Sequence, residues 1–204
     1  IGGKDLLNGK RFDKGGYILT YDYDKWSFID PKEAQKKLNL PRNPRDYTSI
    51  AVTTDDSNDE IVYASSMGDG VIQYKNGTPV QSYNEKNAFK ETAGGYGSGY
   101  CYIDGLAFDK NGNLWMTSSE VNHAVLVLDK AGAWHRLDIE QLRGVYTIND
   151  ILITSTNDKW IYVPRNTPKL VMIPNSESLD EVSSYEFTTL IDTDGKELTP
   201  SNYT

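Results

Sequence analysis

The sequence predicts an all-β fold, a partial β-propeller of four-stranded antiparallel blades, and three observations support this prediction. A segment that begins with Tyr recurs at residues 47–52, 102–108 and 146–152. The copies are spaced at about 40–50 residues, which is the period of propeller blades. Polar turns and further short strands follow each copy, and the final Tyr203-Thr204 matches the opening of two copies. We therefore expect about half a blade, three near-complete blades and the stub of another.

The first part of the chain should end one blade and insert a helix before the next. Residues 1–30 contain a third strand at 17–21 and a fourth at 25–29, and they are taken as the blade end. Asp30 followed by Pro31 combines an N-cap with the residue favoured at the first helical position. We expect one short helix to about Leu38 within the insertion 31–46, placed between blades.

The blades themselves are expected at residues 47–84, 102–140 and 146–192, with an outer strand at 187–191 in the last. Tyr63, Trp115 and Trp160 stand at matching places in the second strands. Large rings of this kind fill the space between neighbouring sheets, so we expect them to pack between adjacent blades.

Residues outside these blades complete the division of the chain. A Gly-rich loop spans residues 85–101, and residues 203–204 start the next blade. Loops of this length often carry function.

Composition excludes several classes of function. The 204 residues include 21 Lys and Arg against 29 Asp and Glu, a formal net charge of -8. Since no basic cluster occurs, nucleic acid is not an expected partner. The fragment has no run of 18 apolar residues and hence no expected membrane span. The single cysteine, Cys101, allows no internal disulfide and is expected to be a buried, inert thiol.

No cofactor, metal or catalytic residue is expected. His123 and His135 are not at metal-ligand spacing, and His135 should face solvent on an outer strand. Residues 109–113 and 192–197 resemble the start of calcium loops but lack the bidentate Glu, and both lie where hairpins need turns. Asp104 and Asp150 lie near the propeller axis, where a carboxylate pair stays possible, although hydrogen bonding to water or backbone is favoured.

A binding surface is predicted from propeller geometry. Loops that join second to third strands, and those that join one blade to the next, gather on one face. The side chains there include types suited to glycan or protein contacts. The candidate ligand-binding residues are Asp69, Tyr96, Tyr100, Tyr102, Asn122, His123, Arg165 and Asn166.

Residues 104–115, with their Asp-x-x-Gly-Asn-Leu-Trp turn, resemble the two-component regulator propeller repeat. The layout over residues 15–204 is also similar to the PorZ-like surface proteins of the type IX secretion system in Bacteroidetes. This resemblance implies a non-enzymatic binding or scaffold propeller of a larger extracytoplasmic protein, at the cell surface or in the periplasm. It implies a protein, glycan or lipopolysaccharide ligand.

Two other functions stay open. The same repeat occurs in periplasmic ligand-sensing propellers of hybrid two-component regulators. The phrase at residues 104–109 also resembles calcium-dependent lactonase-like hydrolases, a more distant alternative. A partial propeller exposes apolar blade faces, so we further expect the fragment to self-associate through them.

Overall fold

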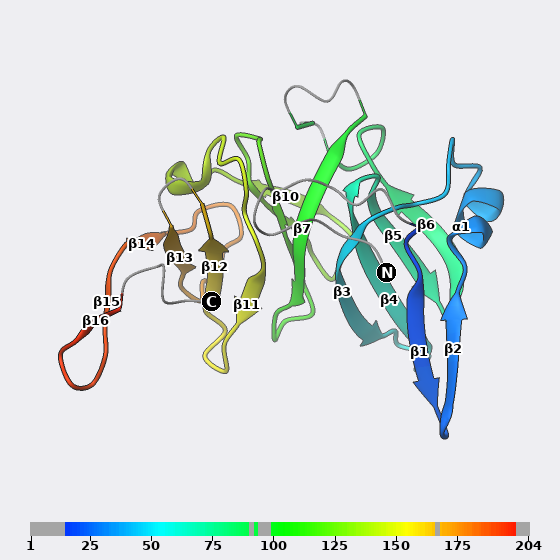
Figure 1. Ribbon diagram of the computed structural model, residues 1–204, viewed down its shortest axis with the longest axis horizontal. Coiled ribbons are helices and arrows are strands. Elements are labelled where there is room, and N and C mark those ends of the chain that lie inside the picture. The colour runs from blue at the N-terminus through cyan, green and yellow to red at the C-terminus, as the bar shows by residue number, and fades with distance from the viewer. Residues whose placement is uncertain (1–14, 90–91, 94–98, 166–167, 199–204) are drawn as a thin grey trace. The chain divides into compact units, whose positions relative to one another are not determined.

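The structure, a computed structural model, describes residues 15–89, 92–93, 99–165 and 168–198 (Figure 1). Antiparallel β-strands dominate this part of the chain, as the sequence predicts. The chain divides into two compact units, Ile1–Leu106 and Ala107–Thr204, which are described in turn. The described part contains no helix long and apolar enough to cross a membrane.

Unit 1 contains a four-stranded antiparallel sheet in which consecutive strands pair, in the order expected of a blade. A separate hairpin and a helix precede this sheet along the chain. The elements are β1 (Ile18–Asp22), β2 (Lys25–Ile29), α1 (Pro31–Leu38), β3 (Tyr47–Thr54), β4 (Glu60–Gly68), β5 (Gly70–Lys75), β6 (Thr78–Tyr83) and β7 (Cys101–Phe108), whose last two residues belong to unit 2.

Helix α1 begins and ends as its sequence signals predict. The Asp30 carboxylate accepts a hydrogen bond from Lys32 N at 2.9 Å, and Pro31 occupies the first turn. Asn39 ends the helix in the left-handed conformation at φ 50°. Ala34 is fully buried, so the helix packs on the unit through one face.

One buried apolar cluster of unit 1 lies on one face of the sheet. Val62, Ala64, Ile72 and Tyr74 form a buried cluster with Ile18 and Ala34. The Tyr74 hydroxyl is 2.7 Å from the Tyr47 hydroxyl, which satisfies both polar groups inside an apolar environment. Because Ile18 of β1 belongs to this cluster, one face of the β1–β2 hairpin packs on the core.

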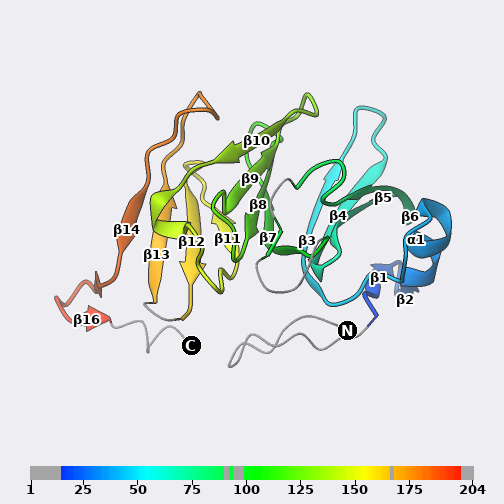
Figure 2. The same ribbon diagram turned by 90° about the horizontal axis from the view of Figure 1, so that it is seen from above.

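Unit 2 contains a second four-stranded antiparallel sheet, β11-β12-β13-β14, which Figure 2 shows as neighbouring strands. Strands β8, β9 and β10 are also antiparallel neighbours. The elements are β8 (Leu114–Ser118), β9 (Val125–Leu128), β10 (Trp134–Leu137), the 3-10 turn η1 (Glu140–Leu142), β11 (Ile151–Ile153), β12 (Lys159–Val163), β13 (Lys169–Ile173), β14 (Tyr185–Phe187), β15 (Leu190–Ile191) and β16 (Glu197–Leu198).

One apolar cluster forms the core of unit 2, with Trp115, Val127, Ile161 and Val171 among its members. Lys159 is buried beside it at 2% exposure, and its Nζ lies 4.4 Å from the centroid of the Trp115 ring. Burial lowers the pKa of Lys159, although Asp109 and Asp158 oppose this effect. The face of an indole ring attracts a cation, so the Trp115 ring replaces part of the stabilisation that water gives to an exposed lysine.

Two strand predictions are wrong in their extent. Of residues 146–152 only Ile151 and Leu152 lie in β11, because Ile148 N donates instead to Ser119 Oγ at 2.8 Å. The expected outer strand 187–191 is split into the end of β14 and β15. Its second part pairs with β16, because Asp192 closes a hairpin turn by accepting from Lys196 N at 2.8 Å.

The matching tyrosines and aromatics do not share one environment. Tyr102 is 2% exposed but Tyr146 is 44% exposed, and Tyr203 lies outside the described residues. Trp115 is buried in the core as expected. Two other rings are partly exposed and stack along their own sheets, Tyr63 on Tyr83 and Trp160 on Phe187.

Candidate functional site

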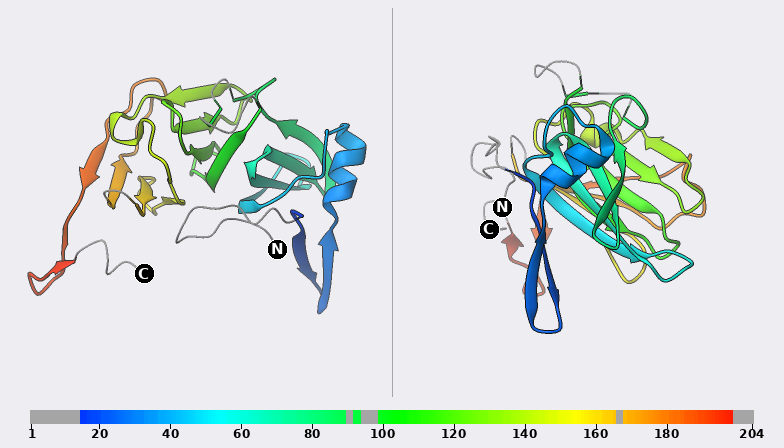
Figure 3. Two further views of the ribbon diagram at one scale, coloured as in Figure 1. Left: turned by 45° about the horizontal axis from the view of Figure 1, so that its top comes forward. Right: turned by 90° about the vertical axis from the view of Figure 1, so that its right-hand side faces the viewer.

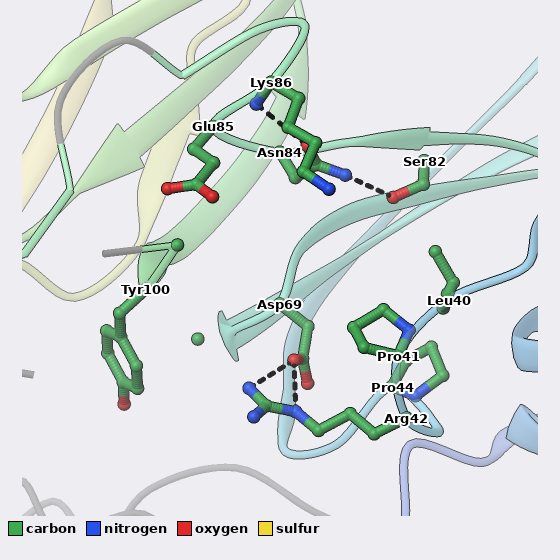
Figure 4. Close-up of a pocket in the computed structure, with 12 residues that line it drawn as sticks. Leu40, Pro41, Arg42, Pro44, Asp69, Ser82, Asn84, Glu85, Lys86 and Tyr100 are labelled. Atoms are coloured by element: carbon green, nitrogen blue, oxygen red, sulfur yellow. Dashed lines mark hydrogen bonds and ion pairs between the residues drawn. The ribbon is translucent and has the colours of Figure 1, made fainter. Parts of the chain in front are cut away.

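Unit 1 carries a pocket of about 310 Å³ where several loops converge (Figure 4). The segment between α1 and β3 forms one wall, and the turn between β4 and β5 forms another. The end of β6 with the segment after it, and the two residues before β7, complete the lining. The lining residues are Leu40, Pro41, Arg42, Pro44, Gly68, Asp69, Ser82, Asn84, Glu85, Lys86, Gly99 and Tyr100.

Asp69 fastens two of these walls together. Its Oδ1 accepts from Arg42 Nε at 2.8 Å and lies 2.6 Å from Arg42 Nη2, and its Oδ2 accepts from Arg45 N at 3.0 Å. The Asp69 side chain is 15% exposed, whereas that of Arg42 is 47% exposed. The carboxylate of Asp69, a predicted ligand residue, therefore binds the α1–β3 segment, while Arg42 is the more exposed partner of the pair.

The turn that presents Asp69 depends on glycine. Gly68 and Gly70 flank it with φ values of 122° and 80°, a region that residues with a side chain rarely adopt. A Cβ at Gly70 would lie 2.1 Å from the carbonyl oxygen of Tyr83. The β6 strand can therefore lie against the turn only because residue 70 lacks a side chain.

A second turn presents the charged residues Glu85 and Lys86. The Asn84 side chain accepts from Lys86 N at 2.9 Å and donates to Ser82 Oγ at 3.2 Å. The carbonyl of Asn84 accepts from Ala88 N at 2.9 Å, which closes the turn. These local bonds fix the backbone at the pocket rim and leave Lys86 exposed.

The two neighbouring tyrosines differ in role. Tyr100 lines the pocket, and its ring meets that of Tyr102 edge to face at 6.2 Å between centroids. Tyr102 is buried with Met67 and Ala93 and is not part of the lining. Tyr102 therefore packs against Tyr100 on the side away from the pocket.

Cys101 is 1% exposed, and burial raises the pKa of its thiol to about 12. Thiol chemistry requires the thiolate, so burial disfavours the reactive form of this cysteine.

The other candidates fall elsewhere in the chain. Asn122, His123 and Arg165 belong to unit 2, and none of them lines the pocket of unit 1. Tyr96 and Asn166 lie outside the described residues. The structure thus brings Asp69 and Tyr100 together in one pocket.

The same pocket is lined by residues that were not among the predicted ligand residues, although two of them lie in the predicted Gly-rich loop: Arg42, Asn84, Glu85 and Lys86. Two signals could have identified them. The first is the rigid Pro-Arg-Asn-Pro loop that contains Arg42, and the second is the Asn-initiated turn at Asn84.

The residues considered for metal or acid–base chemistry have other contacts. Among the described residues no group of three His, Cys, Asp or Glu side chains is arranged to hold a metal ion. Asp109 accepts hydrogen bonds from two backbone amides, from the Asn113 side chain and from Trp115 Nε1. Asp104 belongs to unit 1 and is buried, whereas Asp150 belongs to unit 2 and accepts from Ile151 N.

The expectation that His135 faces solvent is wrong. Its side chain is 21% exposed rather than solvent-facing, and its two ring nitrogens each lie 3.1 Å from a carboxylate, of Asp129 and Asp180. The hydrogen bond with Asp129 is the larger cause of the raised pKa of this imidazole. The residue therefore links two segments of unit 2.

The pocket combines groups of both charge signs with uncharged hydrogen-bonding groups. Arg42 and Lys86 supply cations, Asp69 and Glu85 supply carboxylates, and Ser82 and Asn84 supply uncharged polar groups. Such a lining suits a polar ligand without a large net charge, because no single sign of charge dominates it.

Comparison with known proteins is limited to structure. No protein-family model and no curated protein sequence matches the chain. The chain is similar to PorZ, a surface component of the type IX secretion system of Porphyromonas gingivalis, with a TM-score of 0.77 and 20% identity. It is also similar to the extracellular domain of a hybrid two-component system from B. thetaiotaomicron, with a TM-score of 0.53 and 16% identity.

These two likenesses cover 91% and 96% of this chain but 25% of each of the solved chains. A streptogramin B lyase is a weaker match, with a TM-score of 0.48 and 18% identity over 91% of this chain and 61% of the lyase. The first two proteins are of the kinds that the sequence resemblance names. Together with the antiparallel four-stranded sheets, they show that this chain has the fold of part of a β-propeller.

Proposed function

We propose that the chain is a non-catalytic binding part of a propeller within a larger extracytoplasmic protein, with a scaffold role like that of a type IX secretion surface component. The observation that carries the proposal is the pocket of unit 1, whose walls the Arg42–Asp69 pair holds in place. The likeness to PorZ over 91% of the chain supports the same reading.

The proposed ligand is the saccharide portion of a surface glycan such as lipopolysaccharide. Saccharides present many hydroxyl groups and no large apolar surface, and the pocket offers amide, hydroxyl and charged partners. The volume of about 310 Å³ is at the small end of ligand sites, which suits one or two sugar units.

Binding to immobilised lipopolysaccharide tests this proposal. Lys86→Ala removes an exposed cation from the pocket rim, and we expect it to weaken binding by about tenfold. Lys110→Ala removes an equally exposed cation from a turn of unit 2 and should leave binding unchanged. Equal loss in both variants, or no binding by the unmodified chain, would contradict the proposal. Cleavage of the glycan during the experiment would contradict its non-catalytic part.

A second candidate is a ligand-sensing propeller of a hybrid two-component regulator, which the likeness to that extracellular domain favours. A sensor should bind soluble oligosaccharide fragments released from the lipid. Such fragments should raise the unfolding temperature with increasing concentration, because a ligand that binds only the folded state stabilises it. Binding to intact lipopolysaccharide with no response to the fragments favours the scaffold role.

A further inference from the structure

The hairpin of β1 and β2 has one face packed on unit 1 and one face open to solvent. Ile18 is 6% exposed and belongs to the core, and Ile29 packs against the same cluster. The opposite face and the turn at its end, which contains Tyr23, carry six large side chains, here named the aromatic face, which are 42–92% exposed. They are Tyr17, Leu19, Tyr21, Tyr23, Trp26 and Phe28.

The aromatic face is ordered by the strand register. Leu19 pairs with Phe28 and Tyr21 pairs with Trp26 across the hairpin, so these side chains share one side of the ribbon. The rings of Tyr21 and Trp26 lie 4.9 Å apart between centroids. The Tyr21 hydroxyl donates to Asp24 at 2.7 Å, so its polar atom is satisfied within the hairpin.

The exposed area is that of a protein interface. Aromatic side chains present about 150–250 Å² each, so the aromatic face leaves roughly 600–900 Å² open. Patches on monomeric proteins reach about 300–600 Å². A stable complex needs about 800 Å² per partner, which this face approaches by itself.

We propose that the aromatic face is a dimer interface that packs on the same face of a second copy of this chain. A two-fold interface requires a patch that is complementary to itself. The six side chains carry no formal charge at neutral pH, and the Asp24 carboxylate beside them accepts a hydrogen bond from Tyr21. Both views in Figure 3 show the blue hairpin extending past the β3–β6 sheet of its unit, so a second hairpin can reach it.

The stability of the hairpin gives a second argument. Two-stranded ribbons are marginally stable in water unless a face is covered. Here β1 and β2 form a sheet of their own within the described residues, and the core covers only the Ile18 side. Packing on a second hairpin would cover the other side and complete a two-layer arrangement of the ribbons.

Sedimentation of the full chain over a wide concentration range tests the proposal. We expect the mass to rise from 22.9 kDa toward twice that value. Leu19→Lys places a charge in the aromatic face and should keep the chain monomeric. Leu152→Lys is the matched control, because Leu152 is 66% exposed and Leu19 is 63% exposed, and it should still dimerise. A chain that stays monomeric, or a dimer that Leu152→Lys disrupts and Leu19→Lys does not, overturns the proposal.

A spectroscopic readout guards against a variant that fails to fold. Trp26 is 71% exposed and would lose solvent in the dimer. Its fluorescence should shift to shorter wavelength as concentration rises, and Trp26→Phe should abolish the concentration-dependent shift. A shift that persists in Trp26→Phe would place the contact elsewhere and overturn the proposal.

Discussion

Gly70 is the residue on which the turn beneath the pocket depends. Gly70→Ala should cost at least about 3 kcal/mol, because the new Cβ would collide with the Tyr83 carbonyl and φ is 80°. Gly132→Ala is the control, since φ there is 89° but nothing lies within 4 Å, and should cost about 1–2 kcal/mol. Urea unfolding measures both changes. Equal losses of unfolding free energy in the two variants would mean that the contact between the new Cβ and the Tyr83 carbonyl does not destabilise the protein.

His135 should make the stability of unit 2 depend on pH. Its pKa is raised in the folded state above the ordinary value of about 6.5, chiefly by Asp129. The stabilisation is therefore complete below the unfolded pKa and is lost as pH rises through the folded pKa. The difference in melting temperature between the unmodified chain and His135→Gln should be largest near pH 5 and shrink above neutrality. A difference that grows with pH would contradict this sign.

Single residues also show what sequence reasoning could reach. Asp69 and Tyr100 were predicted as ligand-binding residues from their place between strands and blades. Both line the pocket, and their contact with a ligand stays a prediction. The role of Asp69 could not be predicted, because its partner Arg42 lies 27 positions earlier and only the fold brings them together. Ligand candidates read from loop position alone cannot distinguish a carboxylate that is free from one that is paired.

At the scale of elements, the turn that joins β7 and β8 shows how a repeat motif encodes structure. Asp109 Oδ1 accepts from Asn113 N, and its Oδ2 accepts from Trp115 Nε1, both at 2.9 Å. The Asp, Asn and Trp of the repeat therefore act as one hydrogen-bonded unit. This gives the residues considered for calcium a structural role.

Trp115→Phe should weaken unit 2 by roughly 1–3 kcal/mol, because it removes a donor from a buried carboxylate and reduces core packing. Trp160→Phe serves as control, since Trp160 is partly exposed and keeps its stacking on Phe187 as a phenyl ring. Urea unfolding followed by circular dichroism measures both. A larger loss in Trp160→Phe than in Trp115→Phe would count against the importance of the Asp109 bond.

Element prediction succeeded where local chemistry decides the outcome. Helix α1 has its predicted cap and end, and β2 has its predicted bounds. It failed where distant groups compete for the same backbone. Ile148 N bonds to Ser119, 29 positions away, rather than to a strand. The split of residues 187–191 has a local cause instead, because the turn at Asp192 pairs Leu190 and Ile191 with β16.

At the scale of the whole molecule, the net charge of -8 opposes association of two copies. Added salt screens this repulsion while leaving apolar contact intact. The proposed dimer should therefore become tighter as sodium chloride is raised, which sedimentation at low and high salt can measure. Weakening with salt would indicate an interface held by ion pairs instead.

The repeat period predicted the propeller because it reflects a property of the entire chain, namely the regular return of short strands. The pocket could not be predicted in the same way. Its lining comes from four separate segments between Leu40 and Tyr100, and only the folded unit shows that they meet. The fold was thus accessible from periodicity, whereas the candidate site required coordinates.

The buried amine of Lys159 gives this chain an internal reporter. At 2% exposure it is shielded from acylating reagents, while exposed lysines such as Lys86 and Lys110 should be modified readily. Modification of Lys159 must wait until β12 separates from the indole of Trp115. Mass spectrometry of the acylated chain would then time the transient opening of this sheet without any engineered probe.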